Sequence, residues 1–166
     1  MKKLYLLRHA KSSWNYPELD DFERPLNKRG RSDLPVMARV INKHGIKPDL
    51  IVSSPALRAA FTAINVIQLA GISEDLLTYD NMIYEASTSM LLNLIKSTND
   101  KIDSLMFVGH NPGLTTLASY LSDKQVDNIP TCGLFGMKLK VTNWRDLSEN
   151  SASFLFYEYP KMHHRS

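Results

Sequence analysis

The segment LYLLRHAKSSWN, residues 4–15, guides the interpretation of the whole chain. Its first four residues are apolar and have the length of a short buried strand. Arg8 and His9 follow at once, so a permanent cation and an imidazole stand side by side at the predicted strand end. Taken alone, this pattern also fits a strand end that an arginine merely caps. The ends of the other predicted strands therefore decide what Arg8 and His9 do.

Apolar runs and helix-like segments alternate along most of the chain. Strands are expected at residues 4–7, 50–52 and 104–108, and helices at residues 28–44, 56–70, 87–96 and 114–121. Gly45 and Gly71 close the first two helices, as glycine commonly does. This alternation predicts a mostly parallel sheet covered by helices on both faces.

The pattern changes near the C-terminus. Residues 133–141 and 152–159 form two strand-like runs with no helix between them, which predicts an antiparallel pair at the sheet edge. Residues 161–166 are expected to form a frayed tail. We therefore expect one α/β domain over residues 1–166, a three-layer α/β/α sandwich with a central, mostly parallel sheet and an antiparallel C-terminal edge.

Composition narrows the class of protein. The chain has 166 residues, of which 43% are apolar, and its 20 basic and 17 acidic side chains are mixed along the sequence. Nucleic-acid binders usually concentrate their basic residues, so no nucleic-acid partner is expected. Cys132 is the only cysteine, which excludes an internal disulfide and a cysteine-based zinc cluster. With no signal-peptide core or membrane-length apolar run, we expect a cytoplasmic protein that does not bind a membrane.

Three predicted strand ends carry cationic or potentially cationic side chains. Arg8 and His9 follow the first strand, Arg58 lies in SSPALRAAFTA after the second, and His110 lies in GHNPGL after residues 104–108. Ligands of open α/β sheets bind beyond the carboxyl ends of parallel strands. Two arginines and two histidines gathered there would repel one another unless an anion lay between them.

A phosphoryl group fits this set of donors best. The arginine fork binds phosphate oxygens in pairs, and the two helices that follow add backbone N–H groups at their N-termini. The sequence has no P-loop, no GxGxxG after the first strand and no carboxylate cluster for magnesium, so a nucleotide triphosphatase is not expected. We expect no metal and no cofactor, and an imidazole that itself serves as the nucleophile.

The three motifs LLRHAKSSWN, SSPALRAAFTA and VGHNPG resemble the histidine phosphatase superfamily, which includes the cofactor-dependent phosphoglycerate mutases. RPLNKRG, residues 24–30, is similar to the segment that follows the first motif in the small SixA-type phosphohistidine phosphatases. The resemblance implies that His9 is the phosphorylated nucleophile and that Arg8, Arg58 and His110 complete a phosphate pocket. Ser12 and Asn15 match positions near the phosphate in the mutase-like pattern.

The general acid is the open question of the predicted mechanism. In much of the superfamily a carboxylate after the third strand protonates the leaving group, and Glu85 in MIYEAS is the nearest candidate. Glu85 could equally cap the helix that starts near Ser87. A phosphohistidine leaving group would need less acid assistance than an alkyl phosphate.

These expectations favour a metal-independent phosphatase that acts through phospho-His9 on phosphohistidine or small phosphomonoesters. The short chain leaves no room for a bulky cap, so the site is expected to be open to a phosphorylated small molecule or a phosphohistidine protein. Two alternatives remain, a phosphoglycerate-mutase-like phosphotransferase and a non-catalytic module that binds phosphoproteins. The sequence leaves the oligomeric state undetermined.

Overall fold

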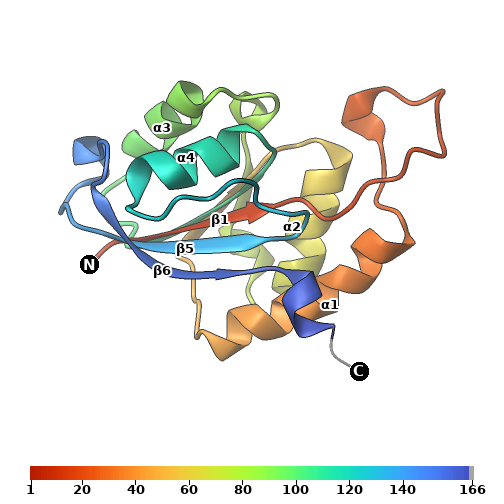
Figure 1. Ribbon diagram of the computed structural model, residues 1–166, viewed down its shortest axis with the longest axis horizontal. Coiled ribbons are helices and arrows are strands. Elements are labelled where there is room, and N and C mark those ends of the chain that lie inside the picture. The colour runs from red at the N-terminus through yellow and green to blue at the C-terminus, as the bar shows by residue number, and fades with distance from the viewer. Residues whose placement is uncertain (165–166) are drawn as a thin grey trace.

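The computed structural model describes residues 1–164, and its strands form a six-stranded sheet in the order β3-β2-β4-β1-β5-β6. β3, β2, β4 and β1 are parallel, whereas β5 is antiparallel to β1, and β6 to β5. This confirms a mostly parallel sheet with an antiparallel C-terminal edge (Figure 1). The strands are β1 (Lys3–Arg8), β2 (Leu50–Ser53), β3 (Leu77–Tyr79), β4 (Ser104–Gly109), β5 (Leu134–Leu139) and β6 (Ala152–Glu158).

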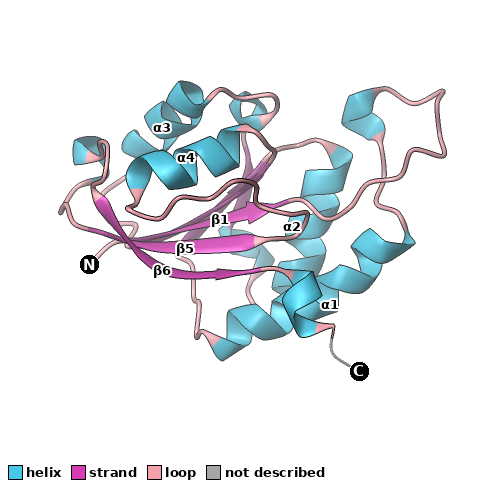
Figure 2. Cartoon of the chain, viewed as in Figure 1, coloured by secondary structure: helices cyan, strands magenta, loops and turns pink. Residues whose placement is uncertain are grey.

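Helices cover both faces of the sheet, as Figure 2 shows. The helices are α1 (Lys28–Lys43), α2 (Leu57–Leu69), α3 (Thr88–Lys96) and α4 (Gly113–Leu121). Short 3₁₀ helices occur at Asp21–Glu23, Glu74–Leu76, Asn81–Ile83, Trp144–Asp146 and Pro160–His163. Gly45 and Gly71 follow α1 and α2 with φ of 64° and 76°, which confirms the predicted glycine helix ends.

Strand residues alternate between two hydrophobic cores. In β1, Leu4 and Leu6 are buried in the core that includes residues of α3 and α4. Tyr5 and Leu7 point the other way, into the core that includes residues of α1 and α2. Because a parallel strand is buried on both faces, its sequence is a continuous apolar run, which explains why residues 4–7 could be recognised.

Two local features differ from the sequence analysis. The edge strand β3 does not coincide with a predicted apolar run, because Thr78 and Tyr79 are exposed. The tail prediction is wrong for residues 161–164, because Pro160–His163 form a 3₁₀ helix and both histidines lie near carboxylates. His163 Nε2 lies 2.9 Å from a carboxylate oxygen of Glu158, and His164 Nε2 lies 3.4 Å from one of Asp33. The rest of the predicted tail, residues 165–166, lies outside the described part of the chain. Within residues 1–164, the helices are all too short or too polar to cross a bilayer.

Candidate active site

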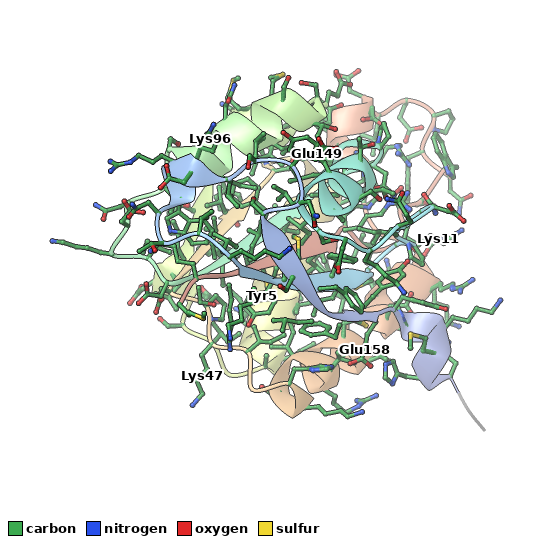
Figure 3. All side chains as sticks on the ribbon, turned by 60° about the vertical axis from the view of Figure 1, so that its left-hand side comes forward. Tyr5, Lys11, Lys47, Lys96, Glu149 and Glu158 are labelled. Carbon is green, nitrogen blue, oxygen red and sulfur yellow. The ribbon has the colours of Figure 1, made fainter. Side chains whose placement is uncertain are left out.

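The carboxyl ends of β1, β2 and β4 lie side by side and bring the three motifs together. Arg8 pairs with Gly109 across β1 and β4, and the His9 N–H donates to the Gly109 carbonyl at 3.0 Å. Ser54, which follows β2, donates its N–H to the Val108 carbonyl at 2.9 Å. A pocket of about 230 Å³ opens at this edge, lined by Arg8, His9, Lys11, Ser12, Trp14, Arg24, Arg58, His110, Asn111 and Thr131. Figure 3 shows Lys11 on the right-hand side of the molecule and Lys96 at the upper left.

His9 is buried and held in one tautomer. Its Nδ1 lies 2.7 Å from the Ala10 carbonyl oxygen, which can only accept, so Nδ1 carries the proton and Nε2 keeps its lone pair. The pKa of His9 is lowered to about 3, mainly by burial and also by the neighbouring His110, Arg58 and Arg8, against the opposing effect of the Ala10 carbonyl. The imidazole is therefore neutral near pH 7, and only the neutral form can act as a nucleophile.

A threonine of α2 fixes the backbone next to His9. The Ala10 N–H donates to Thr62 Oγ1 at 2.9 Å, and the Thr62 hydroxyl donates to the Arg58 carbonyl at 2.7 Å. Thr62 is fully buried. It thereby connects the His9 segment to the helical turn that carries Arg58.

His110 stands beside His9, with 5.1 Å between the ring centroids. Its Nε2 lies 2.8 Å from the Ser54 hydroxyl oxygen, which also accepts the Ala56 N–H at 3.2 Å. Its Nδ1 is buried and has no hydrogen-bond partner among residues 1–164. Burial lowers the pKa of His110 to about 4, and the charge of Arg58 contributes to this shift.

The two arginines supply permanent positive charge. Arg8 donates from Nη1 to the Ile129 carbonyl at 2.9 Å, and Arg58 donates to the carbonyl and carboxylate of Asp21 at 2.6 and 3.0 Å. Within the described chain, the buried Nε atoms of both arginines lack a partner. Buried donors without acceptors are rare, and together with His110 Nδ1 they suit an anion rich in acceptor oxygens.

Asp21 is a site residue that the sequence analysis did not find. Its carboxylate accepts from Arg58, from the Tyr84 hydroxyl at 2.6 Å and from Arg24 at 3.1 Å. The Tyr84 hydrogen bond is the main reason that the pKa of Asp21 falls to about 2, and the same bond raises the pKa of Tyr84 to about 12. Asp21 is therefore ionised, and its hydrogen bonds connect the segment before α1 to α2 and to the segment after β3.

Only one of the two predicted substrate-binding residues lines the pocket. Ser12 lines the pocket, and its Oγ accepts from Arg24 Nη1 at 2.7 Å. Asn15 is exposed and is not among the pocket residues, and its backbone N–H donates to Ser13 Oγ. Arg24 takes part in the pocket instead, with its guanidinium 3.8 Å from the centroid of the Trp14 ring. The signal for Arg24 is its place in RPLNKRG.

Glu85 is exposed and does not line the pocket. It has a left-handed backbone with φ of 56°. Ser87 caps α3 by accepting the Met90 N–H, so the alternative in which Glu85 caps this helix is wrong. The neighbouring Tyr84 approaches the site instead, with its ring 5.5 Å from that of His110. The acid role of Glu85 stays a prediction.

The segment RPLNKRG holds the first loop against α1. Asn27 caps α1 by accepting the Gly30 N–H at 2.8 Å and donates its own N–H to the Lys11 carbonyl. A Cβ on residue 30 would lie 2.2 Å from the Lys11 carbonyl oxygen, so only glycine permits this approach. The segment thus fixes the path of the chain just after His9.

Metal-binding side chains show no cluster in the described chain: residues 1–164 contain no group of three or more His, Cys, Asp or Glu residues arranged to hold an ion. The pocket is rich in fixed cations and neutral imidazoles. Such a set suits an anionic ligand rather than a metal ion.

Comparisons with known proteins agree with this geometry. Residues 4–83 match the profile of the histidine phosphatase superfamily (branch 1). The chain is 31% identical over 153 residues to an uncharacterised chloroplastic protein of Arabidopsis thaliana, covering 87% of this chain and 70% of that protein. The chain is also similar to an Agrobacterium tumefaciens protein assigned as the phosphohistidine phosphatase SixA. The two sequences are 29% identical, and the crystal structure of that protein matches with a TM-score of 0.80 over 96% of this chain and 98% of that one.

A SixA structure complexed with tungstate has the same fold, with a TM-score of 0.81 at 17% identity and coverage of 97% and 99% of the two chains. The profile match includes the first two motifs and ends before His110, which the structure places beside His9. Motifs, fold and relatives therefore agree, and they support a phosphatase activity. The chain belongs to the histidine phosphatase superfamily and is similar to its SixA members.

Proposed function

We propose that this protein is a metal-independent phosphatase that hydrolyses phosphohistidine or small phosphomonoesters through a covalent phosphohistidine on His9. One observation carries the proposal. His9 donates from Nδ1 to the Ala10 carbonyl, so its second nitrogen keeps a lone pair in a pocket of fixed cations. The likeness to an assigned phosphohistidine phosphatase at 29% identity supports the phosphohistidine substrate.

The proposed reaction has two steps. Nε2 of His9 attacks phosphorus and forms a P–N bond, while the bond from phosphorus to the leaving group breaks and the leaving group takes a proton. Water then attacks the phosphohistidine, breaks the P–N bond and releases inorganic phosphate. Arg8 and Arg58 stabilise the charge on the equatorial oxygens in both steps.

In the proposed mechanism, Ser54 positions His110 to bind an oxygen of the phosphoryl group. Phosphoryl oxygens only accept hydrogen bonds, so a neutral His110 can bind one only through a protonated Nδ1. This requires Nε2 to accept a hydrogen bond, and the Ser54 hydroxyl lies 2.8 Å from it. In the proposed arrangement the Ser54 hydroxyl donates to Nε2, and the His110 Nδ1–H points its proton toward the phosphoryl group.

The test compares wild type with His9→Ala on p-nitrophenyl phosphate and on a phosphohistidine-bearing protein, in the presence of EDTA. The proposal predicts activity for wild type and a loss of at least about a thousandfold for His9→Ala. The exposed His164→Ala is the matched control and should keep full activity.

Four outcomes would contradict the proposal. Full activity in His9→Ala would exclude the covalent mechanism, and loss of wild-type activity in EDTA would indicate a metal. A wild type that binds phosphoproteins without hydrolysing any substrate would be a binding module. Transfer of the phosphoryl group to a second phosphoglycerate-like acceptor, in place of water, would favour the mutase-like alternative.

A further inference from the structure

Large apolar side chains are exposed on two segments that contribute residues to the phosphate pocket. The segment between β1 and α1 exposes Trp14, Tyr16 and Phe22, and α2 exposes Leu57 and Phe61. These are five of the eleven large hydrophobic residues exposed within residues 1–164. Single exposed apolar residues are ordinary, whereas a contiguous group marks an interaction surface, so the informative residues are those that line one common depression.

Two of these residues form one wall of an apolar groove. Leu57 and Phe61 lie four residues apart on α2 and therefore share a helix face. They line a groove of about 290 Å³ together with Pro25, Leu26 and Arg31. Arg31 is exposed and is the only charged residue of the groove lining, and its Nη1 donates to the Leu26 carbonyl at 2.8 Å.

The groove adjoins the phosphate pocket along both of its walls. Arg24 of the pocket directly precedes Pro25 of the groove, and Arg58 of the pocket directly follows Leu57. Both arginines bind the carboxylate of Asp21, which holds these walls together. A molecule whose phosphoryl group enters the pocket therefore lies against the groove if it is large enough.

The composition of this surface indicates what such a molecule is. A small phosphoester fills the pocket and leaves the groove and the aromatic rim uncovered. Aromatic residues and arginine together, around a partly apolar depression, are typical of the energetic centres of protein interfaces. The charged residues that line the outer pocket and the groove include Lys11, Arg24 and Arg31. The Asp21 carboxylate offsets part of the charge of Arg24, and the remaining positive charge complements an acidic surface around a phosphoryl group.

We propose that the groove between α2 and residues 25–31 is a docking surface for the phosphorylated protein substrate. An apolar side chain of that partner enters the groove as the phosphorylated side chain enters the pocket, and an acidic residue of the partner faces Arg31. This inference rests on the proposed phosphatase function. It adds to that function a surface that separates protein substrates from small ones.

The test replaces the apolar wall without adding charge near Arg58. The double variant Leu57→Gln, Phe61→Gln is compared with Leu69→Gln, which alters an exposed leucine at the far end of the same helix. The probes are three unrelated small proteins phosphorylated by phosphoramidate on an exposed histidine, free phosphohistidine and p-nitrophenyl phosphate. Circular dichroism and thermal unfolding verify that each variant folds.

We expect wild type to have a kcat/KM at least tenfold higher for one of the phosphoproteins than for free phosphohistidine. The double variant should lose this advantage and keep both small substrates within twofold, and Leu69→Gln should change neither. The docking proposal is overturned if no phosphoprotein exceeds free phosphohistidine. It is equally overturned if the double variant keeps the advantage or loses activity on all substrates alike.

Failure of the underlying function gives a different result. If wild type hydrolyses none of the probes, the phosphatase proposal fails, and calorimetric binding of the phosphoproteins then tests the groove alone. Binding weakened at least tenfold in the double variant, and unchanged in Leu69→Gln, supports docking. If wild type, the double variant and Leu69→Gln bind the phosphoproteins equally well, the docking proposal is overturned.

Discussion

The inner and outer halves of the pocket are built differently. In the inner half, His9 and His110 are held at strand ends by the Ala10 carbonyl and by buried Ser54. In the outer half, Asp21 and Arg24 lie on a loop and are held by contacts among side chains. The sheet therefore positions the reacting imidazoles, whereas the segment between β1 and α1 positions the charged side chains around them.

Arg58 belongs to both halves and should have the largest effect of the residues around the nucleophile. We expect Arg58→Ala to lower kcat/KM by about a hundredfold to a thousandfold, because it removes a transition-state charge and a partner of Asp21. Steady-state kinetics with p-nitrophenyl phosphate measure the loss. Exposed Arg39→Ala is the control, and an effect of similar size in both variants would contradict a specific role for Arg58.

Ser54→Ala probes the inner half through its hydrogen bond to His110. We expect kcat to fall about tenfold, because the Ser54 hydroxyl fixes the tautomer of His110 and a hydrogen bond of this kind contributes about 0.5–1.5 kcal/mol. The ¹⁵N shifts of His110 should show a protonated Nδ1 in wild type and a mixture of tautomers in Ser54→Ala. A single unchanged tautomer in the variant would contradict the positioning role, and exposed Ser97→Ala should alter neither readout.

Asp21→Asn probes the outer half and should affect KM more than kcat. The variant keeps the shape of the side chain but weakens its bonds to Arg58, Arg24 and Tyr84. We expect KM to rise about threefold, because the interaction that orients Arg58 is a charge-assisted hydrogen bond. Removing a negative charge would by itself lower KM for an anionic substrate, so a lower KM would show that orientation by Asp21 is unimportant.

The smallest effect should be the response of His9 and His110 to moderate acid. A free histidine titrates near pH 6.5, whereas burial lowers the pKa of His9 to about 3 and of His110 to about 4. Their NMR signals should therefore stay constant between pH 8 and pH 5. An inflection of either signal near pH 6.5 would contradict the neutral inner pocket.

The same shifts make folding stability depend on pH. Well above pH 6.5 these histidines are neutral in the folded and the unfolded chain, so they do not change the free energy of unfolding. As the pH falls toward 4, the unfolded chain binds protons that the folded chain excludes. The free energy of unfolding should thus fall between pH 6.5 and pH 4. In urea titrations, His9→Gln should make this decline shallower.

The inner half could be predicted from sequence, and the outer half could not. β1, β2 and β4 are buried on both faces, so their apolar runs show where each strand ends and which side chains follow. Asp21 instead meets Arg58 and Tyr84, which are 37 and 63 residues away. Such contacts depend on the path of a loop, and no local pattern encodes them.

The same distinction explains the other differences from the sequence analysis. β3 is a three-residue edge strand whose exposed residues give no apolar run. His163 and His164 look like part of a polar tail, but Glu158 and Asp33 lie within reach only after the chain has folded. The family pattern makes Glu85 the nearest candidate for the general acid, yet the structure leaves Glu85 exposed and brings its neighbour Tyr84 within 5.5 Å of the His110 ring.

The most direct test of the central claim is to trap the phosphorylated enzyme. Wild type is mixed briefly with a phosphohistidine-bearing protein and quenched in alkali, in which phosphohistidine survives, before intact-mass measurement and peptide mapping. We expect one added phosphoryl group, located on His9 and absent from His9→Ala. Turnover without a phosphorylated enzyme, or a phosphoryl group on any other residue, would contradict it.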